Sequence, residues 1–189
     1  MTICWIVEFT HGQFGIADMD APGEPGDLGS EAAGRNLAVV SDDQSEVSIL
    51  TVRYGRYAKV SIDLLESAPS QDNSDWDHVV ECNLNVPSGK VQLWTTVGNT
   101  VFSAATRESE DAEISVQPAV YRMRILFANL ALMHDRLAGA GQEHSRLYYG
   151  DDAIPSDEEL HAMDYYHLLL WPVASPTIKV VKQFHNATS

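Results

Sequence analysis

Alternation of apolar and polar side chains with a period of two residues recurs along this chain of 189 residues. Val80, Cys82 and Leu84 fall on one face of such a run, and Glu81 and Asn83 fall on the other. Successive side chains of a β-strand point to opposite faces, so the pattern predicts strands with one buried face. Helical periodicity is scarce, and no long run indicates a crossover helix. The chain is therefore expected to be mainly β.

Several other segments show the same alternation, and turn residues separate them. The segment "YRMRILF" is expected to bury Tyr121, Met123, Ile125 and Phe127, with Arg122 and Arg124 outside. Further strands are expected at residues 47–53, 57–65, 77–86 and 91–97, in "YYHLLLWPV" and in "TIKVV". Gly55 in "RYGRY" predicts a hairpin turn between residues 47–53 and 57–65. The "PSG" turn at residues 87–89 predicts that residues 91–97 form the partner strand of residues 77–86.

Short strands separated by turns predict an antiparallel β-sandwich, jelly-roll-like, with one or two short helices in its loops. A β-barrel is the alternative. Residues 1–183 are expected to form a single domain, and residues 184–189 a C-terminal tail. In "IPSDEELHAMD", Ser156 precedes Glu159 by three positions, which is a capping-box pattern and predicts a short helix through Met163.

The charge of the chain restricts the partners that it can bind directly. Twelve Lys and Arg residues stand against 27 Asp and Glu residues, which gives a formal net charge of −15. Such a field repels phosphate backbones, so nucleic acid and anionic membranes are disfavoured and a basic partner is favoured. Net acidity also serves solubility alone, and this general explanation stays open.

The chain has two cysteines, Cys4 and Cys82, and both lie within apolar runs. Two distant cysteines in a chain with a sizeable core are typical of buried free thiols in a reducing compartment. The N-terminal run has no basic leader, and Glu8 interrupts it early for a signal peptide. A cytoplasmic protein is expected.

Searches of the sequence for catalytic and metal-binding motifs are negative. No His, Asp or Glu pair has a recognised metal-ligand spacing, so neither a metal site nor a cofactor is expected. The loop "DMDAPGEPGDLGSE" lacks the carboxylates that an EF-hand needs at Pro22 and Gly29. No nucleophile elbow is present, and no enzymatic activity is expected. Asp75, Asp77, His78 and Glu81 form either a site or, as the alternation favours, the solvent-facing side of a strand.

Three features of the sequence together resemble a known group of proteins. They are the His11, Gln13, Phe14 cluster after the first strand, the acidic strand "WDHVVECNL" with its "PSGK" turn, and the terminal Tyr166, Leu168, Leu170, Trp171, Pro172 pattern. Most of the chain resembles small bacterial, often actinobacterial, β-sandwich proteins. More distantly, it resembles competence protein J, an inhibitor that pairs with the competence DNA-entry nuclease. The resemblance implies a non-enzymatic inhibitor or immunity-type protein whose basic partner is a nuclease or toxin.

The chain has an acidic segment that fits such a partner, because no Lys or Arg occurs between Leu147 and Ile178. Its carboxylates form either an interface or a solvated surface. Trp94 is either an exposed aromatic anchor for the partner or a residue that covers a second sheet. The alternative function is a β-sandwich that binds a carbohydrate or another small ligand on Trp and Tyr side chains. The predicted partner-binding residues are Asp151, Asp152, Asp157, Glu158, Glu159, Asp164 and Trp94.

Overall fold

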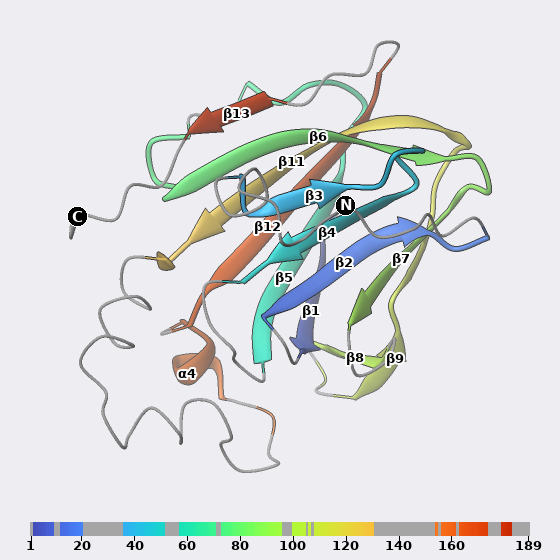
Figure 1. The fold of residues 1–189 in the computed structure, drawn as a ribbon. Helices are drawn as coiled ribbons and strands as arrows, with labels where there is room; N and C mark the ends of the chain where they lie inside the picture. The colour runs from blue at the N-terminus through green and yellow to red at the C-terminus, as the bar shows by residue number, and fades with distance from the viewer. Residues whose placement is uncertain are drawn as a thin grey trace.

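The computed structural model describes residues 2–9, 12–20, 36–51, 57–70, 73–95, 100–104, 106, 108–130, 154, 156–161, 163–173 and 179–182. These residues form two β-sheets that pack face to face (Figure 1). The expected mainly β sandwich is confirmed. The strand order contains details that alternation does not reveal, because alternation carries no information about which strands are neighbours.

The larger sheet has eight strands. Its β12–β5 pair is parallel, so the sheet is not wholly antiparallel as the sequence predicts. In spatial order its strands are β13 (Lys179–Lys182), β6 (His78–Val86), β11 (Ala119–Ala128), β12 (Tyr165–Pro172), β5 (Tyr57–Leu64), β1 (Thr2–Glu8), β8 (Thr100–Ser103) and β9 (Ser109–Asp111).

The smaller sheet has five strands and is antiparallel throughout. In spatial order its strands are β10 (Glu113–Ser115), β7 (Lys90–Thr95), β2 (Gln13–Asp18), β4 (Glu46–Leu50) and β3 (Ala38–Val40). The short segment from β9 to β10 passes from the edge of the larger sheet to the edge of the smaller one.

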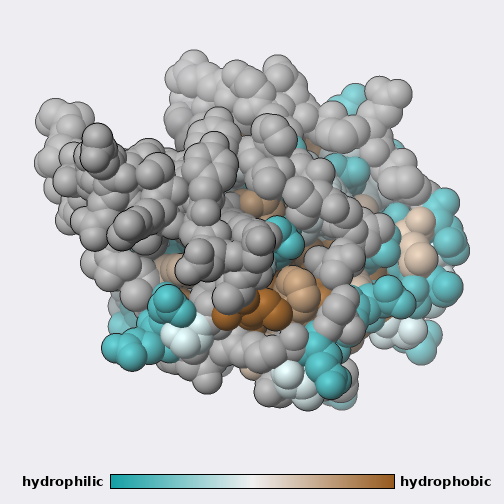
Figure 2. Space-filling view, turned by 90° about the horizontal axis from the view of Figure 1, so that it is seen from below, coloured by the Kyte–Doolittle hydropathy of each residue, from teal (hydrophilic) through white to brown (hydrophobic). Residues whose placement is uncertain are grey.

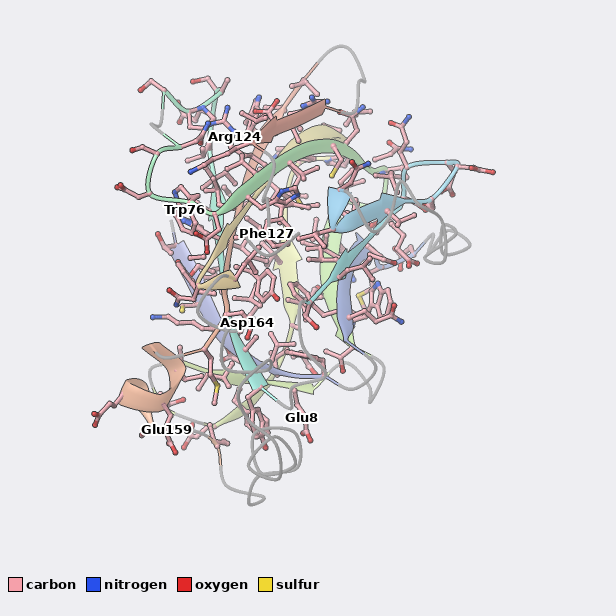
Figure 3. The ribbon with its side chains drawn as sticks, turned by 60° about the vertical axis from the view of Figure 1, so that its left-hand side comes forward. Glu8, Trp76, Arg124, Phe127, Glu159 and Asp164 are labelled. Carbon is pink, nitrogen blue, oxygen red and sulfur yellow. The ribbon has the colours of Figure 1, made fainter. Side chains whose placement is uncertain are left out.

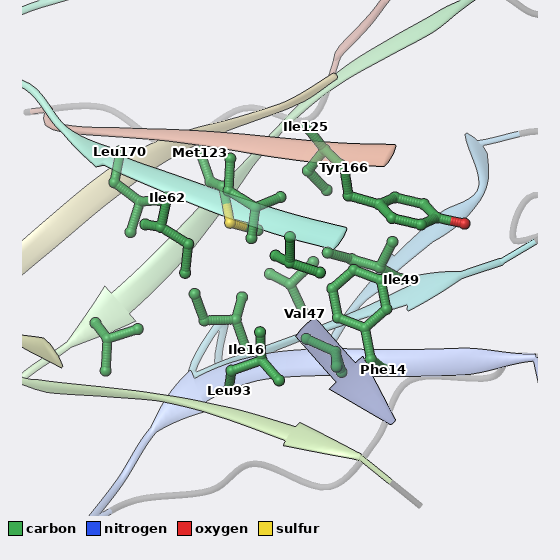
Figure 4. Packing of buried hydrophobic residues seen from close by; sticks show 14 of the residues in the cluster. Phe14, Ile16, Val47, Ile49, Ile62, Leu93, Met123, Ile125, Tyr166 and Leu170 are labelled. Carbon is green, nitrogen blue, oxygen red and sulfur yellow. The ribbon is translucent and has the colours of Figure 1, made fainter. Parts of the chain in front are cut away.

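The inner faces of the two sheets share one hydrophobic core (Figure 4). Phe14 and Ile16 of β2 meet Met123 of β11 and Tyr166 of β12 in this core, and all four are fully buried. The ring of Phe14 lies edge-to-face on Tyr166 at 5.1 Å. Each large apolar side chain buried in this way contributes about 1.5–3 kcal/mol to the folded state. The alternation assigned the inner face of β11 correctly, since Met123 and Ile125 are both buried.

Two hairpins expected from the sequence are wrong. Strands β6 and β7 flank the "PSG" turn, but they lie in different sheets, so residues 87–89 form a corner. Gly89 has a φ of 75°, and a Cβ there would lie 2.9 Å from the carbonyl oxygen of Val116. Strands β4 and β5 also lie in different sheets, and the "RYGRY" segment itself falls outside the described residues. A tight turn is equally compatible with a corner and with a hairpin.

The connection between β5 and β6 crosses the larger sheet. Strands β12 and β6 are each antiparallel to β11, so they run in the same direction as each other. Because β5 is parallel to β12, β5 and β6 also run in the same direction. Residues 65–70 and 73–77 therefore pass β12 and β11 on the outer face of the larger sheet. A second hydrophobic cluster lies under this crossover: Val79, Leu126, Leu169 and Trp171, with Leu65, Trp76, Val173 and Val181 packed against them.

The described part of the chain contains one helix of more than a single residue, α4 (Asp157–His161). At five residues it is far shorter than a membrane span, and no described helix is long and apolar enough to cross a membrane.

Candidate functional site

The predicted acidic segment is partly described. Asp151 and Asp152 fall outside the described residues, and Asp157 is described only as the first residue of α4. Glu158 and Glu159 are exposed. Figure 2, which views the end of the molecule that carries α4, shows hydrophilic side chains around a hydrophobic centre.

The capping box at the start of α4 is confirmed. The Ser156 hydroxyl donates to Glu159 Oε2 at 2.7 Å, and the Glu159 amide donates back to Ser156 Oγ at 3.3 Å. The Ser156 amide also donates to Glu159 Oε2 at 2.7 Å, and the two hydrogen bonds that the hydroxyl and amide of Ser156 donate hold the pKa of the Glu159 carboxyl below its usual value. Glu159 therefore has a local structural role, whereas Glu158 has no described partner. The helix ends at His161, two residues before the predicted end.

The expectation that Asp164 belongs to the acidic surface is wrong. Its exposure is 0%, and its Oδ2 accepts a hydrogen bond from the hydroxyl of buried Tyr166 at 2.5 Å. Asp164 immediately precedes β12 and lies two residues before Tyr166, so it shares the inner side of the strand. Figure 3 shows Asp164 beside the strands and Glu159 on the helix. Only the tertiary pairing of β12 reveals this burial.

Trp94 lies on the outer face of the smaller sheet, where it is half-buried. Its cross-strand neighbour is Gly15, and a Cβ at Gly15 would overlap the indole ring. The absence of a side chain at Gly15 thus lets the ring lie flat on β2. The indole nitrogen is shielded from solvent and has no hydrogen-bond partner among the described residues. Trp94 covers its own sheet, and its role with a partner stays a prediction.

Glu81 of β6 and Asp77, which directly precedes β6, contact other residues of the protein and do not form the expected solvent-facing strand surface. Glu81 lies between two arginines of β11: its Oε1 is 2.6 Å from Arg124 Nη2, and its Oε2 is 3.3 Å from Arg122 Nε. All three side chains are at least 87% buried. Asp77 accepts a hydrogen bond from the amide of Leu130 at 2.7 Å. Both acids therefore have structural partners.

His78 is also part of the structure of this strand. It is fully buried, and its Nε2 lies 2.8 Å from the carbonyl oxygen of Asn36. Burial lowers the pKa of its imidazole, although the hydrogen bond to Asn36 opposes this. Cys82 of the same strand is a buried free cysteine, and burial raises the pKa of its thiol to about 12.

The sequence analysis did not identify a polar and aromatic cluster on the outer face of the larger sheet. His167 of β12 lies 3.0 Å from Asp63 Oδ2 of β5, and the Tyr165 hydroxyl donates to Ser61 Oγ at 2.9 Å. Ser61 in turn donates to Cys4 Sγ at 3.4 Å. The cluster joins β12, β5 and β1, three strands that are far apart in the sequence and adjacent in the sheet.

The electrostatics of the cluster follow from its partial burial. Burial acts to raise the pKa of the Asp63 carboxyl, but the hydrogen bonds from Thr2 and His167 and the charge of His167 outweigh it, so the pKa is lowered. Burial raises the pKa of the Tyr165 hydroxyl, which therefore stays protonated and donates to Ser61. The side chains of His167 and Asp63 keep 17% and 19% of their exposure, so the pair still reaches solvent.

Trp76 covers this cluster from the crossover. Its ring centroid lies 5.8 Å from that of Tyr165 and 5.9 Å from that of His167. Lys182 of β13 fixes the backbone beside it, because its ammonium donates to the carbonyl oxygens of Asn73, Ser74 and Trp76. Figure 3 shows Trp76 and Arg124 on one side of the larger sheet and Phe127 on the other. A tryptophan in an otherwise polar connector is the sequence signal for this arrangement.

A second acidic surface lies where β9 passes into β10. Four carboxylates in this stretch are exposed. The Trp5 indole donates to Glu110 Oε1 at 2.6 Å, and Glu113 lies 4.0 Å from Lys90 Nζ. The acidic residues of this surface are Glu108, Glu110, Asp111 and Glu113.

None of these arrangements is a recognisable catalytic or metal centre. Among the described residues, no group of three or more His, Cys, Asp or Glu side chains is placed to hold a metal ion. What the described residues present is a rigid sandwich with exposed carboxylates at α4 and between β9 and β10, and an aromatic cluster on the larger sheet. These features suit recognition of another molecule.

The fold defines the class of this protein as a two-sheet β-sandwich, and two solved structures share that fold over nearly the whole chain. The first is described as crocagin biosynthetic gene J; at 19% sequence identity it matches 91% of this chain and 97% of its own, with a TM-score of 0.52. The second is ComJ from Bacillus subtilis, described as an inhibitor of the DNA degrading activity of NucA. At 12% identity it matches 92% of this chain and 99% of its own, with a TM-score of 0.57. The resemblance to competence protein J is thereby confirmed as a likeness of fold.

No family model matches the chain, and no curated protein matches its sequence. At these identities the two neighbours show the fold alone.

Proposed function

We propose that this protein is a non-enzymatic inhibitor that binds a basic partner protein, and that the partner is a nuclease. The observation that carries the proposal is the likeness to ComJ, an inhibitor of a nuclease, over 92% of this chain and 99% of that one. An inhibitor needs a rigid surface and no catalytic group of its own. The described residues supply such a surface on two tightly packed sheets.

Charge supports a basic partner. The chain carries a formal net charge of −15, and exposed carboxylates occur at α4 and between β9 and β10. A nuclease binds the phosphates of its substrate with cations, and carboxylates placed on those cations would compete with the nucleic acid. Complementary charge would also accelerate association by about 10- to 1,000-fold at low ionic strength.

The proposal places the protein in the cytoplasm. Its two cysteines are both free in the structure, which supports a reducing compartment. The high pKa of buried Cys82 keeps that thiol protonated and slow to react.

The test is inhibition of DNA degradation by a nuclease of the same organism that resembles NucA, with NucA itself as a comparison. We expect the purified protein to slow cleavage in a saturable, stoichiometric manner. A bovine serum albumin control of similar acidity separates specific inhibition from general charge effects. Unchanged cleavage at a large molar excess of the protein would contradict the proposal.

The contribution of α4 is tested with Glu158→Lys, because Glu158 is exposed and takes no part in the capping box. If α4 contacts the partner, the variant should associate more slowly at low salt, and the difference should shrink as salt screens the charges within about 8–10 Å. Glu159→Gln is the matched variant, since it perturbs the cap without reversing a charge. Equal association rates for wild type and Glu158→Lys across the salt series would remove α4 from the interface.

A further inference from the structure

Trp76 is the half-buried residue at which the crossover meets the outer face of the larger sheet. One side of its ring packs toward Tyr165 and His167, with centroid distances of 5.8 and 5.9 Å. Its position is fixed from several directions, because Lys182 binds its carbonyl oxygen and the next amide, of Asp77, donates to Phe127 O at 2.8 Å. A tryptophan held in this way loses little conformational entropy when it binds a partner.

Two aromatic rings on the same face already carry cations from within the chain. The guanidinium of Arg124 lies 5.6 Å from the ring centroid of Trp171 while it pairs with Glu81 at 2.6 Å. Lys59 Nζ lies 5.6 Å from the ring centroid of Tyr165. A cation over an aromatic ring, with a carboxylate beside it, is thus the local arrangement on this face.

Trp76 differs from these rings because no described lysine or arginine lies over it. Asp75, the adjacent residue, is exposed and has only a 3.4 Å hydrogen bond from the Ser74 hydroxyl. Glu66 is also exposed, but it follows Leu65, whose amide donates to Leu170 O, so it lies toward the other end of β12 and away from Trp76. The crossover therefore presents an aromatic ring next to one carboxylate, Asp75, that has no described cation of its own.

We propose that Trp76, with Asp75, is the docking site for an arginine side chain of a basic partner protein. The proposal rests on the proposed function, and it names the surface that makes the contact. Arginine fits better than lysine, because a planar guanidinium stacks on an indole and pairs with a carboxylate through a rigid fork of donors. The described arrangement of Arg124, Trp171 and Glu81 is the intramolecular counterpart of this contact.

The cationic side chains on this face of the larger sheet already have partners within the protein. Arg124 pairs with Glu81, Lys182 donates to three backbone carbonyls, and His167 lies against Asp63. Because Lys59 already lies over the ring of Tyr165, we expect an arginine of the partner to dock at Trp76 and not at Tyr165. Trp and Arg are the residues that most often dominate binding energy at protein interfaces.

The direct test follows the tryptophan indole signals of ¹⁵N-labelled protein during titration with an acetylated tetra-arginine amide. The chain has four tryptophans, and single Trp→Phe variants assign their signals. We expect the Trp76 signal to shift saturably with tetra-arginine and less with tetra-lysine of the same charge. The Trp94 signal serves as the control, since Trp94 is also half-buried but lies on the outer face of the other sheet. A stationary Trp76 signal, or equal shifts for Trp76 and Trp94, would overturn the proposal.

Variants give a second measurement. Trp76→Ala should weaken tetra-arginine binding by about tenfold, as expected for a residue at the centre of a contact, and Trp94→Ala should leave it unchanged. Because Trp76 also packs on the second hydrophobic cluster, Asp75→Asn provides a variant at an exposed position that keeps the fold, and Glu66→Gln at the far end of the crossover is its matched control. Asp75→Asn should weaken binding and Glu66→Gln should leave it unchanged, and unchanged affinity in a folded Asp75→Asn protein would contradict the site.

The outcomes separate this site from the proposed function. A shifted Trp76 signal without inhibition of any tested nuclease would refute the nuclease inhibitor and support the arginine site. Inhibition that Trp76→Ala and Asp75→Asn leave intact would refute the site and support the inhibitor. Loss of inhibition in these variants, with inhibition retained in Trp94→Ala, would support both.

Discussion

Glu81 and Glu46 are both carboxylates on outer sheet faces, but their surroundings differ. On the larger sheet, Glu81 lies between Arg122 and Arg124. On the smaller sheet, Glu46 is 5% exposed, accepts a 3.3 Å hydrogen bond from Ser48 and has no described cation beside it. Burial, with a further contribution from Asp43, therefore raises the pKa of Glu46 despite the opposing hydrogen bond. The contribution of a partly buried carboxylate to stability depends on the residues beside it on neighbouring strands. The alternation within its own strand does not specify those residues.

The two faces also hold their tryptophans differently. Trp76 lies on the larger sheet because a crossover and the Lys182 ammonium place it there. Trp94 lies on the smaller sheet because Gly15 leaves room for its ring. One position depends on hydrogen bonds between distant segments, and the other on the absence of a single side chain. The following changes test this contrast.

The largest effect is expected for Glu81→Gln. Removing the charge leaves two mostly buried guanidinium groups without a counterion, which should lower the free energy of unfolding by about 2–4 kcal/mol. Urea denaturation at neutral pH measures it. The control is Glu113→Gln on the smaller sheet, whose 4.0 Å pair with Lys90 is exposed and should contribute less than about 1 kcal/mol. Equal losses of unfolding free energy in the two variants would show that Arg122 and Arg124 do not make Glu81 more important for stability than an exposed carboxylate.

The next effect is expected for Gly15→Ala. The new Cβ would overlap the Trp94 ring, so the ring must move and the protein should lose about 1–3 kcal/mol of stability. Because the two residues share one contact, the double variant Gly15→Ala, Trp94→Ala should lose less than the sum of the single variants. Additive losses in denaturation curves would show that the indole does not constrain position 15.

Lys182→Met should have a smaller effect, near 1 kcal/mol, because the ammonium donates to three carbonyl oxygens at a half-buried position. Its loss should loosen residues 73–76, and amide hydrogen exchange should become faster there. Lys90→Met on the smaller sheet is the control, since Lys90 is exposed and should change stability by less than about 0.5 kcal/mol. Unchanged exchange at residues 73–76 would argue against a fixing role for Lys182.

The smallest effects are expected in the pH dependence, and they have opposite signs on the two faces. The lowered pKa of Asp63 adds stability above its ordinary value of 3.8, and this is lost as the pH falls through the folded-state pKa. The raised pKa of Glu46 adds stability at low pH, which is lost as the pH rises from 4.5 through the folded-state value.

Melting temperatures of the wild type, Asp63→Asn and Glu46→Gln from about pH 3 to about pH 7 measure these effects. Asp63→Asn should weaken the decline in stability in acid, and Glu46→Gln should remove a decline toward neutral pH. Parallel curves for all three proteins would show that neither carboxyl has a shifted pKa.

Features that depend on neighbours in the sequence were predictable. The capping box of Ser156 and Glu159 formed as expected, because its four atoms belong to one turn. The inner faces of β6 and β11 were also assigned correctly, since Leu84 and Ile125 are both buried. Alternation is enough for this result, because a one-residue shift would expose a whole apolar face.

Features that depend on distant segments were not predictable. The sequence placed Asp164 on an acidic surface, but its position beside Tyr166 on the inner side of β12 buries it. The sequence also treated Asp77 and Glu81 as a solvent-facing edge, and their partners come from β11 and from Leu130, two residues after it. A carboxylate in a sequence window does not indicate whether a cation or an amide will lie opposite it.

The sequence by itself determined a mainly β chain, the buried side of β6 and β11 and the cap of α4, because periodicity and capping are local properties. The tertiary structure alone decided that β6 and β7 belong to different sheets and that residues 65–70 and 73–77 cross the larger sheet. It also brought Trp76 onto Tyr165 and His167. The physical reason is that sheet order depends on packing between segments far apart in the chain, and many orders satisfy the same alternation.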